Sequence, residues 1–179
     1  QFTPQTDERF PVVDGRRYYN LWRGFAVEPD AGASCDLLYD LIENTLADGD
    51  PKVAEYVLNW MAHAVQFPAE PAEVAVVFRG EKGTGKGTLG RAFYRLFGPH
   101  GIQTGSPGLL TGRFNIHLRN TVALFADEAF YAGDAKGESI LKALVTEPHL
   151  MFEGKGTNAI MGLSCLHSMM ASNMQWVVP

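Results

Sequence analysis

Residues 74–97 read VAVVFRGEKGTGKGTLGRAFYRLF, and this stretch decides the fold. The five apolar residues from Val74 to Phe78 predict a buried strand, because they leave no polar face for solvent. A glycine-rich segment, Gly80 to Lys86, follows. The segment after it carries apolar side chains at helical spacing, which predicts a helix: Leu89, Phe93, Leu96 and Phe97. A strand, a glycine-rich loop ending in lysine and a helix, in that order, are the setting in which GxxxxGK binds phosphate.

Each part of this loop has a physical reason to hold an anion. The glycines allow successive backbone N–H groups to turn toward one point. The start of the helix adds a partial positive charge, and Lys86 adds a full one for the β- and γ-phosphates of a nucleotide. The alternative is a surface turn that merely contains a lysine, and the flanking strand and helix argue against it. The predicted nucleotide-binding residues are Gly80, Gly83, Thr84, Gly85, Lys86, Gly87 and Thr88.

One position of the loop departs from the usual pattern. Gly87 follows Lys86, where Ser or Thr normally offers its hydroxyl to Mg²⁺. Thr88 comes one place later, so its hydroxyl is expected on the metal or, as we favour, on the α-phosphate. Mg²⁺ keeps several waters when it binds to proteins, so carboxylates elsewhere can complete its shell.

A second chemical signal is a pair of carboxylates at the end of an apolar run. Thr121 to Ala126 predicts a buried strand, and Asp127 and Glu128 follow it directly. We expect Asp127 to hold the Mg²⁺ shell and Glu128 to orient or polarise the attacking water. Many strands end in acidic turns, so this signal gains its weight from the phosphate loop that precedes it.

Two further segments complete the candidate site. Leu166 to Ala171 predicts a strand next to the one that ends in Asp127, and its terminal Asn173 is expected to contact the γ-phosphate or to position the water. Strands over 150–153 and 159–161 form a candidate hairpin, with Lys155 between two glycines at its tip. Such a lysine is usually only solvated, but in a ring-shaped motor it can hold a nucleic-acid phosphate.

Composition limits the classes of function. The chain has 179 residues, 46% of them hydrophobic, and a net charge of −5, which excludes a generally basic nucleic-acid surface. No run approaches the roughly 18 apolar residues of a membrane span, and no signal peptide is present, so we expect no membrane contact and a cytoplasmic location. Cys35 and Cys165 lack metal-ligand spacing and are expected to be free thiols. The chain looks like a piece of a longer protein.

The residues before the loop predict a lead-in and a helical subdomain over 1–70, followed by a nucleotide-binding core over 71–179. Residues 1–30 have little periodicity and three prolines, so we expect extended chain with short strands. Their aromatic residues are expected to pack against the domain rather than to stack on bases. Ser34 caps a helix predicted over 35–46, and Asp50 with Pro51 starts a second over 51–66. His63 is expected to be a packed or capping residue.

The remaining elements are predicted more coarsely. We expect a short strand over 100–104, a loop over 105–108, a loop over 133–137 and a short helix over 138–145. Arg113 and Arg119 lie between these elements, and Lys142 lies within the helix predicted over 138–145.

Together these segments resemble helicase superfamily 3, the compact AAA+ motors of small viruses, phages and plasmids. Closer still, the chain resembles the helicase-like ATPase domain of phage and plasmid primase–helicase or polymerase–helicase proteins. The resemblance covers nearly the whole chain from about Tyr19. It lies in these segments: NLWRGF (20–25), FRGEKGTGKGT (78–88), GRFN (112–115), FADEA (125–129), LKALVTEP (141–148), EGKG (153–156) and SNMQWVVP (172–179).

The resemblance implies a P-loop NTPase fold, with a parallel sheet flanked by helices. It implies that residues 80–88 are Walker A, that Asp127 and Glu128 are Walker B, and that Asn173 is sensor 1. Lys155 falls in the hairpin that grips single-stranded DNA in the pore, and Lys142 has a less certain role. The family's arginine finger would follow the sensor strand, beyond Pro179, so this fragment is expected to hydrolyse ATP weakly.

The implied function is therefore that of an ATP- and Mg²⁺-dependent DNA motor, a helicase-type ATPase that assembles into a homo-oligomeric, hexameric ring in a replication protein. In a phage protein this would act in the host cytoplasm. Two alternatives remain open. The Lys-Gly-Thr order also occurs in nucleoside monophosphate kinases, so a phosphotransferase is one. The other is a non-catalytic module in which ATP only fixes the shape of an oligomer.

Overall fold

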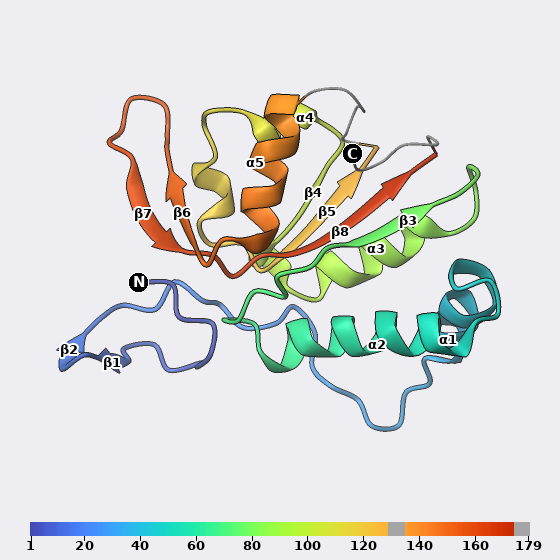
Figure 1. Cartoon of the computed structure of the whole chain (residues 1–179). Coiled ribbons are helices and arrows are strands. Elements are labelled where there is room, and N and C mark those ends of the chain that lie inside the picture. The colour runs from blue at the N-terminus through green and yellow to red at the C-terminus, as the bar shows by residue number, and fades with distance from the viewer. Residues whose placement is uncertain (129–134, 174–179) are drawn as a thin grey trace.

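The protein is built on a four-stranded parallel sheet, seen here in a computed structural model that describes residues 1–128 and 135–173 (Figure 1). The strands lie in the order β3-β8-β5-β4. Their bounds are Val76–Arg79 for β3, His167–Ser172 for β8, Ala123–Asp127 for β5 and Gly101–Thr104 for β4. Both faces of such a sheet must be covered, and β5 and β8 are accordingly buried along almost their whole length.

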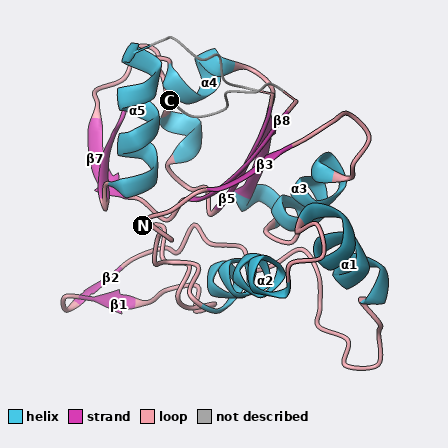
Figure 2. Ribbon diagram, turned by 45° about the vertical axis from the view of Figure 1, so that its right-hand side comes forward, coloured by secondary structure: helices cyan, strands magenta, loops and turns pink. Residues whose placement is uncertain are grey.

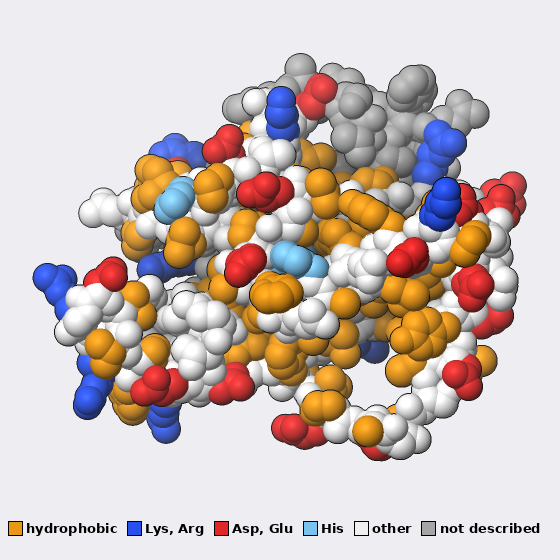
Figure 3. Space-filling model, turned by 60° about the horizontal axis from the view of Figure 1, so that its bottom comes forward, with side chains coloured by type: hydrophobic (Ala, Val, Ile, Leu, Met, Phe, Trp, Pro, Cys, Tyr) orange, Lys and Arg blue, Asp and Glu red, His pale blue; other side chains and the backbone are white. Residues whose placement is uncertain are grey.

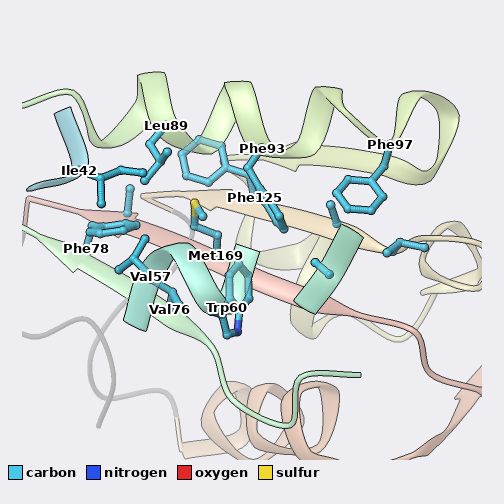
Figure 4. Packing of buried hydrophobic residues seen from close by; sticks show 14 of the residues in the cluster. Ile42, Val57, Trp60, Val76, Phe78, Leu89, Phe93, Phe97, Phe125 and Met169 are labelled. Atoms are coloured by element: carbon cyan, nitrogen blue, oxygen red, sulfur yellow. The ribbon is translucent and has the colours of Figure 1, made fainter. Parts of the chain in front are cut away.

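One face of the sheet packs against α2 (Pro51–Gln66), α3 (Lys86–Arg95) and the π-helical segment η1 (Leu41–Leu46). Their shared core is shown in Figure 4 and includes Ile42, Val57, Trp60, Leu89, Phe93, Phe125 and Met169. Gly90 brings α3 close to the sheet, because a Cβ atom at this position would lie 2.2 Å from the ring of Phe125. The helix after the phosphate loop is thereby fixed against the strand that ends in the acidic pair.

The opposite face carries α4 (Pro107–Thr111), α5 (Ala135–Thr146) and the hairpin of β6 (His149–Phe152) and β7 (Ile160–Leu163). Their apolar cluster is Leu110, Leu118, Leu124, Leu141, Leu144, Phe152 and Met170 with its neighbours. Two 3-10 turns complete the connections: η2 (Gly98–His100) lies between α3 and β4, and η3 (Ile116–Leu118) lies between α4 and β5. Figure 2 shows the sheet between the two layers. Within the described residues, no helix is long and apolar enough to cross a membrane.

The N-terminal lead-in is extended and contains the short hairpin of β1 (Val12–Val13) and β2 (Arg16–Arg17). Asn20 fixes it through side-chain bonds to the backbone of Thr3, Thr6 and Glu8. The buried Trp22 joins it to the main core. The prediction of an extended segment with short strands is confirmed, and Trp22 packs into the core as expected, whereas Tyr19 and Phe25 stay 36% and 38% exposed.

Several predicted elements are confirmed with shifted ends, and α2 matches its prediction throughout. Asp50 caps α2 by accepting hydrogen bonds from the backbone N–H groups of Lys52 and Val53. The predicted strands 74–78, 100–104, 121–126 and 166–171 appear as β3, β4, β5 and β8, and 150–153 with 159–161 appear as β6 and β7. End positions shift by one or two residues because hydrophobic runs do not mark where hydrogen bonding stops.

Three details of the sequence prediction are wrong. The helix expected over 35–46 is α1 (Asp36–Asp40) followed by η1, in which the N–H of Ala47 bonds to Ile42, five residues back. Ser34 still receives a hydrogen bond from the N–H of Asp36. The loop expected over 105–108 contains the start of α4, because Pro107 suits the first helical position. The loop expected over 133–137 lies partly outside the described residues, and α5 already begins at Ala135.

Candidate nucleotide-binding site

The glycine-rich loop joins β3 to α3 at the carboxyl edge of the sheet. The N–H of Gly80 donates to the carbonyl oxygen of Ser172 in β8 at 3.2 Å, so the loop starts in register with the sheet. Gly83 and Gly85 have φ values of 90° and 85°, a region that side-chain-bearing residues disfavour. Gly85 is also the N-cap residue of α3, and a Cβ atom there would lie 2.5 Å from Cδ1 of Leu41. The conformation of the loop therefore requires glycine at positions 83 and 85.

Lys86 is the buried cation of this loop. It opens α3 and is only 7% exposed. Its Nζ donates to the carbonyl oxygens of Gly80 at 2.8 Å and Glu81 at 2.6 Å, and to Oγ1 of Thr84 at 3.2 Å. Among the described residues, no carboxylate lies within ion-pair distance of it. Buried charges are normally paired, so this ammonium group is in a position to receive an anion.

The acidic pair lies at the end of β5. Asp127 is half-buried, and its Oδ2 accepts a long hydrogen bond from Nε2 of Gln103 in β4 at 3.4 Å. The backbone N–H of Glu128 donates to the carbonyl oxygen of Ala171 at 2.9 Å. Glu128 has a φ of 55°, which is unfavourable for a residue with a side chain and occurs preferentially at functional sites. This turn directs its exposed carboxylate away from the path of the strand.

Asn173 meets Glu128 directly. Its Nδ2 donates to Oε1 of Glu128, although the two residues are far apart in the chain. The contact follows from the sheet order, since β8 runs beside β5 with Ala171 opposite Asp127. The expected neighbourhood of this asparagine and the acidic pair is present.

The sheet order sets the spacing between the loop and the acidic pair. The acidic strand does not lie directly beside the strand of the phosphate loop, because β8 separates β3 from β5. Two strand spacings place their ends about 10 Å apart. Asn173 emerges in the gap between the loop and the acidic pair. All the flanking groups come from one edge of the sheet.

The threonines of the loop have different environments. Thr84 donates its hydroxyl to the carbonyl oxygen of Glu81 at 3.0 Å and helps to hold Lys86. Thr88 is exposed in the first turn of α3, with its N–H bonded to Gly85 at 2.9 Å. In the described part of the chain, no group of three His, Cys, Asp or Glu side chains forms a metal cage. Asp127 is the half-buried carboxylate at this edge, and a carboxylate oxygen is a ligand type that Mg²⁺ accepts.

The predicted nucleic-acid residue lies elsewhere. Lys155 is exposed at the tip of the β6–β7 hairpin, and Figures 1 and 2 place this hairpin on the opposite side of the molecule from the phosphate loop. Arg113 forms an ion pair at 2.8 Å with Glu153, which directly follows β6, and the hydrogen bond that it donates to this carboxylate raises the pKa of Arg113. Lys142 is exposed on α5, and Arg119 follows η3.

The sequence reasoning missed two residues of this region. Gln103 contacts Asp127 from the edge strand β4, and Leu41 packs where Gly85 lacks a side chain. The contact of Gln103 with Asp127 could not be predicted from the strands alone, because it requires knowing that β4 lies beside β5. Leu41 carries no signal, because its contact depends on how η1 folds onto the loop.

Comparison with known proteins adds the following. A family model described as a family of unknown function, DUF5906, matches residues 78–179. The DNA primase-polymerase of Nitratiruptor phage NrS-1 is 29% identical over 144 residues, which is 79% of this chain and 19% of that protein. Two apo structures of the NrS-1 C-terminal region superpose with TM-scores of 0.79 and 0.80 at 23% identity. They cover 96% of this chain and 41% and 42% of theirs, and they show a shared fold.

Proposed function

This chain belongs to the family of unknown function DUF5906, and from that premise we propose that it is the ATP-hydrolysing motor domain of a phage or plasmid replication protein. The glycine-rich loop supplies a P-loop NTPase site, and the name of the phage relative, a DNA primase-polymerase, suggests that this site serves DNA replication. This chain spans about one fifth of that relative.

The observation that carries the proposal is the environment of Lys86. A buried ammonium group held only by backbone oxygens and a hydroxyl, with no carboxylate in ion-pair range among the described residues, calls for an anionic ligand. The positive-φ glycines and the start of α3 surround it. Together these groups favour the β- and γ-phosphates of ATP over a single inorganic anion.

The residues divide the work of binding as follows. Residues 80–88 hold the phosphates, with Lys86 exchanging its contacts to Gly80 and Glu81 for phosphate oxygens. Asp127 is the protein ligand of Mg²⁺, and Thr88 contacts the α-phosphate. Bound Mg²⁺ neutralises charge that develops on the phosphate oxygens.

Glu128 and Asn173 carry the hydrolytic step. Glu128 aligns a water molecule and accepts its proton as the water oxygen attacks the γ-phosphorus and the bond to ADP breaks. Asn173 donates to Glu128 and so orients the carboxylate. When nucleotide is bound, its amide senses the γ-phosphate, which couples the orientation of Glu128 to the state of the nucleotide.

The motor function needs parts that a single copy of this chain does not supply. In the full-length protein we propose a hexameric ring in which Lys155 holds single-stranded DNA and moves with the ATP cycle. A cationic residue must also reach the γ-phosphate, a contribution worth about 10³–10⁵ in rate in GTPases. Arg113 is a poor candidate, since Glu153 pairs with it. Unchanged single-strand affinity of a Lys155→Glu ring would contradict the DNA part.

The test of the nucleotide site compares two lysines of one loop. Lys86→Ala removes the buried cation, and Lys82→Ala removes an exposed one four residues earlier. We expect Lys86→Ala to weaken ATP binding about 10- to 100-fold, as for hydrogen bonds between charged groups, and to abolish hydrolysis. Lys82→Ala should keep both within about twofold. Equal ATP affinities of the two variants in isothermal titration calorimetry would refute the site.

A further inference from the structure

The N-terminal lead-in encloses a hollow of about 640 Å³ on the surface away from the phosphate loop. Two arginines, Arg9 and Arg23, line it above a floor formed by the buried Trp22. Phe25 and Glu28 lie at the same hollow. Nothing in the proposed ATP chemistry uses these residues.

Arg9 and Arg23 share a single aromatic ring. Their guanidinium carbons lie 5.6 Å and 5.3 Å from the ring centroid of Tyr19. Nη1 of Arg23 also donates to the Tyr19 hydroxyl at 2.8 Å, and this bond is the main cause of a lowered pKa of Tyr19. In the described chain neither guanidinium lies within 4 Å of a carboxylate. Two cations on one ring repel each other, so an anion between them would relieve the repulsion.

The backbone that carries these arginines is held firmly. The N–H of Arg23 donates to Nε2 of His100 at 3.0 Å, and the rings of Trp22 and His100 stack at 4.8 Å. The indole N–H of Trp22 donates to Asp7 at 2.9 Å. Asp7 and Glu28 also line the hollow, but neither carboxylate lies within 4 Å of the guanidinium group of Arg9 or Arg23. Binding here would therefore not have to order a loose segment first.

The surroundings of the hollow define the ligand. Phe10 is 49% exposed and Phe25 is 38% exposed, so flat apolar rings flank the cations. Arg9 also lies over the ring of Phe10, at 5.8 Å. Arg16 and Arg17 are exposed on the adjoining β2. Figure 3 shows basic side chains, with acidic ones among them, at the end of the molecule where Figure 1 has β1 and β2.

Alternating cations and exposed rings match the repeat of a single-stranded nucleic acid, with charged phosphates and stackable bases. We propose that this surface, consisting of Arg9, Phe10, Tyr19, Arg23 and Phe25, is a second binding site for single-stranded DNA, separate from the hairpin at Lys155. A phosphate lies between the two guanidinium groups and a base stacks on Phe10. The choice of DNA rests on the proposed function, whereas the site itself requires no ATP hydrolysis.

The test measures binding of a fluorescein-labelled oligothymidylate to the full-length protein by anisotropy at several salt concentrations. The variant is Arg9→Gln with Arg23→Gln, and the control of equal charge change is Lys52→Gln with Arg95→Gln, both exposed on α2 and α3. We expect the variant to lose at least about tenfold in affinity. Its salt slope should fall by about 0.7, the value for one phosphate contact on a single strand. The control should lose little, and an equal loss in both would overturn the site.

Two further arms separate the alternatives. Phe10→Ala removes an exposed ring from outside the core and should weaken binding about tenfold, which keeps the proposal testable if the double arginine variant unfolds. Unlabelled thymidine monophosphate should not displace the strand, and efficient displacement would show a free-nucleotide site instead. If ATP turnover proves absent while the arginine variant still loses DNA, the proposed ATPase fails and this site stands.

Discussion

Lys86 and Glu128 both lower the stability of the fold locally, the first through a buried charge with no ion-pair partner among the described residues and the second through a strained backbone conformation. Burial of an ammonium group without a counter-ion is unfavourable, and a φ of 55° at a glutamate is strained by about 1–3 kcal/mol. Folding tolerates both because the surrounding backbone fixes them. Under the proposed function, the phosphates of a bound nucleotide would supply the missing charge, and the turned carboxylate would orient the reacting water.

Glu128→Gln should therefore separate binding from hydrolysis. The amide keeps the shape of the side chain but cannot accept the proton of the attacking water. We expect turnover to fall by about 10²–10⁴, the usual contribution of a general base, while ATP affinity stays within a few-fold. The control is Glu138→Gln, an exposed glutamate on α5, which should retain activity. A steady-state phosphate-release assay with a parallel binding titration decides, and retained turnover in Glu128→Gln would contradict the assigned role.

Gly85 and Gly83 permit a matched comparison within one loop. Both have positive φ, but only Gly85 faces a neighbour: a Cβ atom at this position would clash with Leu41, whereas one at Gly83 would meet nothing within 4 Å. Gly83→Ala should lower the free energy of unfolding by about 1–2 kcal/mol through backbone strain alone. Gly85→Ala should cost a further 1–3 kcal/mol, roughly, through overpacking.

Urea denaturation of both variants measures this difference. Adding Leu41→Ala to Gly85→Ala should recover part of the loss, because the clash disappears while the strain remains. Equal stability of the two glycine variants would show that η1 does not pack on the loop as described.

At the scale of elements, a histidine pair joins α2 to β8. Nδ1 of His167 faces the carbonyl oxygen of Cys165, so it is the donor, and its Nε2 accepts from Nδ1 of His63 at 3.2 Å. Burial lowers the pKa of His167 to about 4. The sequence prediction of a packed histidine at position 63 agrees with this contact. Protonation of His167 would remove the acceptor and place a charge in the core.

Acid should therefore weaken the attachment of α2. The unfolded chain binds a proton on His167 near pH 6.5, whereas the native state does so only near pH 4. Stability is thus complete above pH 6.5, falls as the pH drops below it and levels off below about 4, by roughly 3 kcal/mol in all. Carboxylates also titrate in this range, so the measurement is the difference in urea stability between wild type and His167→Gln at pH 7 and pH 5. A constant difference would contradict this account.

Element prediction succeeded where local chemistry decides and failed where tertiary contacts decide. Asp50 and Pro51 specify the start of α2 by themselves, and the glycine pattern specifies the phosphate loop. The π-helical turns of η1 depend on packing against α2 and α3, and no residue pattern announces them. The position of β8 between β3 and β5 is likewise a property of the sheet, not of any strand.

The same limit applies to the sites. Lys86, Asp127, Glu128 and Asn173 each end or follow a recognisable strand, so their common edge was predictable from parallel pairing. The cluster of Arg9, Tyr19 and Arg23 has no spacing rule, because the extended lead-in brings these residues together through Asn20 and His100.

For the whole molecule, the helical layer on one face of the sheet touches the phosphate loop through Leu41 and shares a core with α3. Nucleotide binding should therefore stabilise the entire fold and not only the loop. With ATP at about 100 times its dissociation constant, the free energy of unfolding should rise by about 2.7 kcal/mol. Thermal melts should show this shift for wild type and Lys82→Ala and lack it for Lys86→Ala, and a shift in all three would place the nucleotide elsewhere.

A crystal structure of the protein with Mg²⁺ and a non-hydrolysable ATP analogue tests the central claim most directly. We predict that Nζ of Lys86 leaves the carbonyl oxygens of Gly80 and Glu81 for the β- and γ-phosphates, with the metal beside Asp127 and the γ-phosphate near Asn173. A nucleotide bound away from this edge, with Lys86 still on its loop carbonyls, would contradict the account.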